Sequence, residues 1–111
     1  MKIGSGQQSS LSGVKAYGAA ISATAHNVAN LNTEDFSPLD RRFTDQRPGV
    51  KVTLSRRDPP TSPMSSRRND LSQSMVRLVG DGHAYKANLT ALQQQMDLQE
   101  TAIDILDARY T

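Results

Sequence analysis

Residues 70–111 have the sequence DLSQSMVRLVGDGHAYKANLTALQQQMDLQETAIDILDARYT, and the heptad pattern within this stretch decides the fold. Apolar residues recur at alternating spacings of three and four, as on the seam of a coiled-coil helix. Ten of the twelve seam positions are apolar, the exceptions being Gly82 and Gln99. The pattern predicts a helix over 70–111, about 60 Å long at about 1.5 Å per residue. Its predicted packing residues are Leu71, Met75, Leu78, Tyr85, Leu89, Leu92, Met96, Ile103 and Leu106.

Two glycines interrupt this helical pattern at Gly80 and Gly82. Each costs about 1 kcal/mol relative to alanine inside a helix. The sequence leaves open whether the helix bends there, breaks there, or crosses another helix closely.

A shorter heptad pattern lies near the N-terminus. It predicts a helix over 11–31 whose many alanines and glycines would let a second helix approach closely. The ten residues before it are rich in Gly, Ser and Gln, and we expect 1–10 to be disordered. The seam of this helix consists of Val14, Tyr17, Ile21, Thr24, Val28 and Leu31.

Residues 32–69 separate the two predicted helices and contain all five prolines. The alternation of apolar and polar residues over 49–54 predicts a short strand near 50–54, or half of a hairpin. The proline-rich stretch 58–63 should be extended, because proline excludes helix. The predicted fold is therefore mainly α, with an N-terminal and a C-terminal helix on either side of an irregular middle that contains a short β segment.

Charge is unevenly distributed along the chain. Residues 36–69 hold eight basic and three acidic side chains, whereas residues 70–111 hold three basic and six acidic ones. This asymmetry favours self-association or packing against an acidic neighbour.

The absence of cysteine excludes disulfides and thiolate metal sites. No apolar run is long enough to span a membrane, and residues 1–10 lack the apolar core of a Sec signal peptide.

Residues 25–36, AHNVANLNTEDF, resemble the signature A-N-N-[IVL]-A-N-x-x-T-x-G-[FY] of the flagellar axial proteins, which are the rod, hook and hook-associated subunits. His26 and Asp35 stand where that family usually has Asn and Gly. Because aspartate tolerates the left-handed conformation better than most residues, the turn can survive this change. The residues that match are Asn27, Val28, Ala29, Asn30, Thr33 and Phe36.

Two further stretches are similar to the proximal rod subunits of that family. Residues 49–53, followed by Asp58 and Pro59, look like the element G-V-x-V…D-P-S-P. Residues 70–88 look like D-L-x-x-x-M-V-x-L-[IV]-x-A-x-R-A-Y-x-A-N, with Tyr85, Ala87 and Asn88 among the matches and His83 in place of the usual Arg. The three elements occur in the family's order.

The resemblance implies a structural subunit of the bacterial flagellar rod, whose antiparallel N- and C-terminal helices form a coiled-coil-like hairpin. Copies would polymerise helically through their terminal helices into a hollow tube that links the motor's membrane ring to the hook and transmits torque. The implied partners are copies of itself, other rod subunits, the membrane-ring and rod-adaptor proteins, and the flagellar export apparatus. The implied location is the basal body, where the rod crosses the periplasm, reached by export led by residues 1–10 without a Sec signal.

The sequence offers little support for other functions. His26 and His83 have no accompanying catalytic cluster, and Gly80-x-Gly82 lacks the preceding strand and third glycine of a phosphate loop. We therefore predict no enzymatic activity, no cofactor and no metal. Three arginine pairs begin at residues 41, 56 and 67, but without a recognition helix we predict no nucleic-acid binding. The alternatives left open are a free-standing helical-hairpin binding module, such as a chaperone or regulator, and a small basic nucleic-acid binder.

Overall fold

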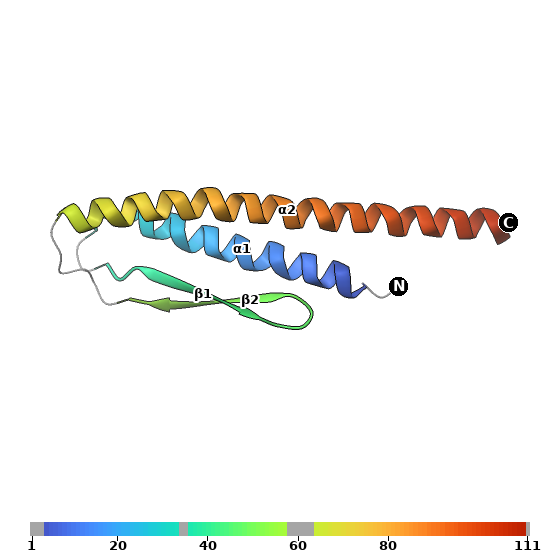
Figure 1. Cartoon of the computed structure of the whole chain (residues 1–111), viewed down its shortest axis with the longest axis horizontal. Helices are drawn as coiled ribbons and strands as arrows, with labels where there is room; N and C mark the ends of the chain where they lie inside the picture. The colour runs from blue at the N-terminus through green and yellow to red at the C-terminus, as the bar shows by residue number, and fades with distance from the viewer. Residues whose placement is uncertain (1–3, 34–35, 58–63, 111) are drawn as a thin grey trace.

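The computed structural model describes residues 4–33, 36–57 and 64–110. Within these ranges the chain forms α1 (Ser5–Ala29), β1 (Leu39–Asp45), β2 (Val50–Arg56) and α2 (Met64–Tyr110). The molecule is elongated, with extents of 71 × 21 × 17 Å, and α2 runs along its whole length (Figure 1). The predicted mainly helical fold with a small β segment is confirmed.

Helices α1 and α2 lie side by side and run in opposite directions (Figure 1). Gly6 near the start of α1 lies beside Gln95, and Gly13 one heptad later lies beside Asn88. A Cβ atom added at Gly13 would lie only 2.5 Å from Cγ of Asn88, so the absence of a side chain there permits the close approach. Residues 100–110 of α2 extend past the start of α1, and all of them are exposed. We call this segment the C-terminal overhang.

The buried residues of α1 are small or polar. Among the residues that the structure describes, no large side chain is fully buried, and the buried apolar side chains are all alanines. Small residues let two helix backbones approach closely, but they remove little apolar area from water. The buried side chains of α1 are Gln7, Ser10, Ala16, Ala20, Ala23 and Thr24.

Strands β1 and β2 form an antiparallel hairpin in which Leu39 lies opposite Arg56 and Asp45 opposite Val50. In its turn, the Gln46 N–H donates to the Gly49 carbonyl at 2.9 Å. Gly49 has φ +109°, a conformation that favours glycine.

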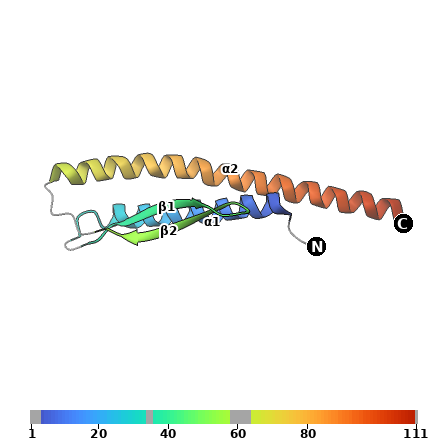
Figure 2. The ribbon, with the colours of Figure 1, turned by 60° about the horizontal axis from the view of Figure 1, so that its bottom comes forward.

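The tip of the hairpin is fixed on α1. The Val50 N–H donates to Ser12 Oγ at 3.0 Å, and a Cβ on Gly49 would overlap the Ser12 side chain. Figure 1 shows α1 between α2 and the hairpin, and Figure 2 shows the hairpin running along α1.

Helix α1 begins at Ser5, six residues before the predicted start at 11, and ends at Ala29 rather than at 31. Residues 5–10 are helical, so the prediction of disorder over 1–10 is wrong for them, while residues 1–3 lie outside the described ranges. The reason lies in the packing: Gln7 is buried, and its Nε2 donates to Gln99 Oε1 of α2 at 2.8 Å.

The middle segment is more regular than predicted. Strand β2 covers the predicted strand near 50–54. Strand β1 was not predicted, because four of its seven residues are charged, a composition more typical of a loop. The extended conformation predicted for 58–63 falls outside the described residues. Helix α2 begins at Met64, six residues before the predicted start at 70.

The glycine pair leaves α2 continuous. The helix runs without interruption from Met64 to Tyr110. Nothing lies within 4 Å of a Cβ added at Gly80 or Gly82, so neither glycine makes room for a neighbour. Of the three outcomes that the sequence leaves open, a break and a glycine-dependent close crossing are therefore excluded.

Candidate assembly surfaces

Asn27 ties the end of α1 to the start of the hairpin. Its Nδ2 donates to the Leu39 carbonyl and its Oδ1 accepts from the Leu39 N–H, both at 2.8 Å. Because an amide side chain carries both a donor and an acceptor, Asn27 pairs with Leu39 much as a neighbouring strand would. The Arg57 N–H, donating to the Pro38 carbonyl at 2.8 Å, closes the open end of the hairpin beside it.

Asn30 organises the C-terminal end of α1. Its backbone N–H and its Nδ2 both donate to the His26 carbonyl, at 3.1 and 2.9 Å, which satisfies a carbonyl that the helix end leaves without an intrahelical partner. The Thr33 hydroxyl donates to Asn30 Oδ1 at 3.2 Å, and the ring of Phe36 packs edge-on to that of His26 at 5.3 Å. Four of the motif residues predicted from the sequence, together with His26, thus surround one helix end.

The remaining motif residues have less in common. Val28 is half-buried, whereas Ala29 and Ala87 are exposed. Tyr85 packs against Gly18 of α1, at 3.5 Å from an added Cβ. Asn88 donates through Nδ2 to the Ala84 carbonyl at 2.8 Å, and this bond holds its side chain over Gly13.

The face of α2 that contacts α1 is rotated from the predicted seam. At the predicted seam positions, Tyr85 lies against Gly18 and Gln99 accepts a hydrogen bond from Gln7, while Leu78 and Leu92 have intermediate exposure. Asn88 and Gln95, which were not predicted, lie against Gly13 and Gly6. Polar side chains outside the predicted seam are also partly or fully covered. The added positions are Ser74, Asp81, Asn88 and Gln95, each one residue before a predicted seam position.

The other predicted seam positions of α2 form a second stripe beside this contact. Met75 is 52% exposed and Met96 56%, while Leu89 is intermediate. Leu71, Ile103 and Leu106 are also exposed, the last two in the C-terminal overhang. Val76, Val79, Leu98, Ile105 and Tyr110 add further exposed apolar surface. The structure therefore divides the predicted seam between a contact within the chain and an uncovered stripe.

On α1 the predicted seam residues point to different neighbours. The Tyr17 ring lies 4.9 Å from the Phe43 ring of the hairpin, measured between centroids. Val14, Ile21 and Val28 are half-buried. The fully buried positions are instead small residues, because only these fit where the helices approach most closely.

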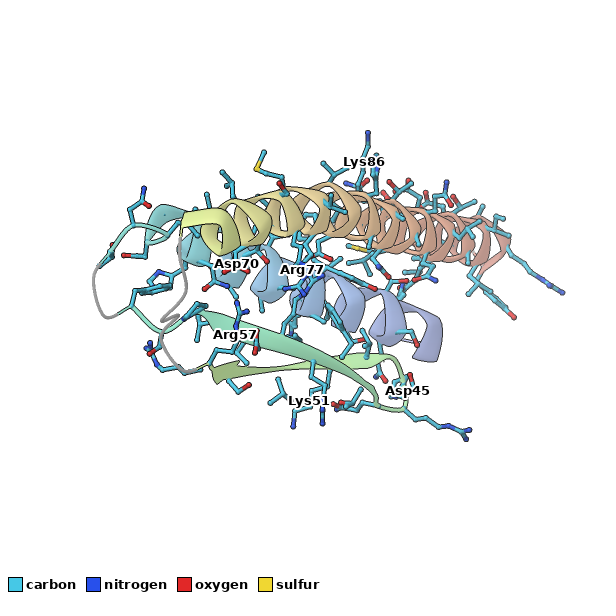
Figure 3. All side chains as sticks on the ribbon, turned by 60° about the vertical axis from the view of Figure 1, so that its left-hand side comes forward. Asp45, Lys51, Arg57, Asp70, Arg77 and Lys86 are labelled. Carbon is cyan, nitrogen blue, oxygen red and sulfur yellow. The ribbon has the colours of Figure 1, made fainter. Side chains whose placement is uncertain are left out.

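A charged cluster joins the hairpin to α2 and was not predicted. Arg41 of β1 forms an ion pair with Asp81, which is 5% exposed and lies between the two helix glycines. Burial lowers the pKa of Arg41 from its ordinary value, and the nearby positive charge of Arg77 lowers it further. Arg77 reaches from α2 toward the hairpin (Figure 3). A carboxylate within an apolar heptad pattern is the sequence signal that could have indicated this pair.

The arginine pairs do not form one surface. Arg41 is turned toward Asp81, while Arg42 and Arg56 are exposed and Arg57 pairs with Asp40 at 2.9 Å. The pair at 67–68 lies in the first turns of α2, outside the part for which side chains are described.

Within the described ranges, no group of three or more His, Cys, Asp or Glu side chains could hold a metal ion, and neither helix has a stretch apolar enough to cross a membrane. Comparison of the chain with protein-family models, with curated proteins and with solved structures gives no match.

Proposed function

We propose that this chain is a structural subunit of the bacterial flagellar rod. In this proposal α1 and α2 form a coiled-coil-like assembly domain, and copies polymerise helically to link the motor's membrane ring to the hook and transmit torque. The subunit catalyses no reaction and uses no cofactor.

The observation that carries the proposal is the uncovered stripe on α2. Its exposed large apolar residues lie in two parts of the helix, from Leu71 to Val79 and from Met96 to Tyr110, and the buried apolar side chains of α1 are all alanines. Exposed apolar surface of this extent on a small chain marks sites of association. A chain that leaves this many large apolar side chains exposed is suited to an assembly in which neighbouring copies cover them.

The network at the end of α1 supplies independent support. Asn27, Asn30, Thr33 and Phe36 are the residues on which the resemblance to the axial proteins rests, and in this fold they set the path of the chain from α1 into the hairpin. Asn27 and Asn30 hydrogen-bond to backbone groups, while Thr33 and Phe36 contact the side chains of Asn30 and His26. A fixed helix-to-hairpin angle is what a subunit that repeats in a regular tube requires.

The proposed partners are copies of this chain, other rod subunits, the membrane-ring and rod-adaptor proteins, and the export apparatus. The proposed location is the basal body, reached by export without a Sec signal. Deletion of residues 1–10 should keep the protein in the cytoplasm. If this truncated protein still reached the basal body, residues 1–10 would not be the export signal, and the signal would lie elsewhere in the chain.

The test of the rod assignment is a replacement strain. Leu92→Asp places a charge in the contact between the helices, at a cost of several kcal/mol if the charge stays unpaired. We expect loss of motility and absence of the protein from isolated basal bodies. The exposed neighbour Gln93 changed to Asp is the matched control and should behave as the parent. Normal swimming with Leu92→Asp would refute the assembly role of this contact.

The alternative of a free-standing binding module predicts a different outcome. Such a protein would melt cooperatively as a monomer and would be absent from basal bodies of the parent strain. A nucleic-acid binder would instead give a tight, salt-sensitive gel shift with the unmodified protein.

A further inference from the structure

A groove runs between α1 and the hairpin, on the side of α1 that α2 leaves uncovered. Its apolar lining comes from Leu11, Ala16, Val50 and Val52, and the charged residues that line it are two lysines, with Asp45 next to it opposite Val50. Lys15 lies on the α1 side and Lys51 on the hairpin side, and both are exposed. The groove contains about 770 Å³ of space, part of it open to solvent.

The C-terminal overhang has the complementary character. Ile103, Leu106 and Tyr110 follow one another at spacings of three and four, so they share one face of the helix. Glu100 and Asp104 lie on the neighbouring face. The overhang holds three acidic residues and one arginine, opposite in sign to the groove.

The large apolar residues of the overhang are uncovered in the part of the chain that the structure describes. All of its residues are exposed, and it projects by about 16 Å at about 1.5 Å per residue. The overhang continues α2 and so needs no nucleus of its own, but most helical stability in proteins comes from the packing of an apolar face. A surface that covers the apolar face of the overhang would therefore stabilise the overhang and bury apolar area of its own.

We propose that the C-terminal overhang of one copy docks in the groove between α1 and the hairpin of a second copy. The apolar face of the overhang covers Leu11, Val50 and Val52, and its acidic face lies beside the two lysines. Long lysine side chains can lie along such a helix while their ammonium groups reach its carboxylates. This inference rests on the proposed self-assembly of the subunit and names the two surfaces that meet.

A charge-reversal experiment on the full chain tests the docking. Lys15→Glu with Lys51→Glu should weaken self-association about tenfold in sedimentation velocity, and Glu100→Lys with Asp104→Lys should do the same. Mixing the two double variants should restore association between them to the parent level. Lys86→Glu, on an exposed part of α2 outside the groove (Figure 3), is the control and should change nothing. Far-UV circular dichroism should show equal helix content in all of them, since every changed side chain is exposed.

Cross-linking supplies a second readout that does not depend on the strength of association. The chain has no cysteine, so Lys51→Cys in one preparation and Asp104→Cys in another give a disulfide only between two copies. We expect this pair to cross-link faster than Asp104→Cys with Lys86→Cys. Equal rates for the two pairs, or failure of the mixed charge variants to associate, would overturn the docking. Detection of the parent protein in basal bodies would still support the rod assignment in that case, so the two proposals can fail separately.

Discussion

Gly13→Ala tests whether α1 and α2 pack through a glycine contact. An added Cβ would lie 2.5 Å from Cγ of Asn88, whose Nδ2 bond to the Ala84 carbonyl holds it in place. Overpacking costs about 1–3 kcal/mol, and a displaced Asn88 loses a hydrogen bond contributing about 0.5–1.5 kcal/mol. Against this, alanine gains about 1 kcal/mol of helix propensity. We expect a net destabilisation of about 1–3 kcal/mol.

Gly18→Ala is the matched control within the same helix. Its added Cβ would meet Tyr85 at 3.5 Å, an ordinary contact, so the propensity gain should remain and stabilise the protein by about 0.5–1 kcal/mol. Urea unfolding followed by far-UV circular dichroism would measure both variants. Opposite signs are expected, and Asn88→Ala should relieve the effect of Gly13→Ala in the double variant. Equal stabilisation by the two alanines would refute the close packing at Gly13.

Four further substitutions test the glycine pair of α2, the ion pair and the Asn27 hydrogen bonds. Gly80→Ala and Gly82→Ala should each stabilise the protein by about 1 kcal/mol in thermal melts, because no atom stands in the way of either Cβ; a loss of stability would show that the helix bends there. Asp81→Ala should destabilise it by about 1–3 kcal/mol in urea unfolding, since it removes the partner of the half-buried Arg41, and replacing both residues by apolar ones should recover most of this loss. Asn27→Asp keeps the acceptor but loses the donor toward β1, so amide hydrogen exchange in the hairpin should accelerate while exchange in α2 stays unchanged; equal acceleration in both would mean that Asn27 supports the whole fold.

The heptad spacing of the C-terminal half was enough to predict the long helix, because apolar periodicity persists over many turns. It did not predict which face meets α1. That face includes Asp81, Asn88 and Gln95, and its position depends on glycines and alanines of α1 that let the backbones approach. A pattern of apolar residues cannot reveal a contact made by small and polar ones.

Strand β1 shows a similar limit. Leu39 and Phe43 alternate with charged residues in a way that allows a strand, but Arg41 occupies an inward position that is usually apolar. The compensating charge, Asp81, lies forty residues away in a helix, so no local signal shows that Arg41 is paired. The resemblance singled out Asn27 and Asn30 as important, while their bonds to Leu39 and His26 emerge only from the fold.

The elongated shape of the molecule, with extents of 71 × 21 × 17 Å, affects how the chain unfolds. Its radius of gyration is 19.3 Å, against about 13 Å for a compact domain of about 100 residues. No central cluster exists among the described residues on which all others depend, so each turn is stabilised mainly by the turn beside it, as in a zipper or a repeat protein. Unfolding should then spread inward from the C-terminal overhang, with graded local stability rather than a single value for the whole chain. Contact with a neighbouring copy would raise the local stability of each turn that it covers. The helices would therefore become less mobile, step by step, as more copies assemble around them.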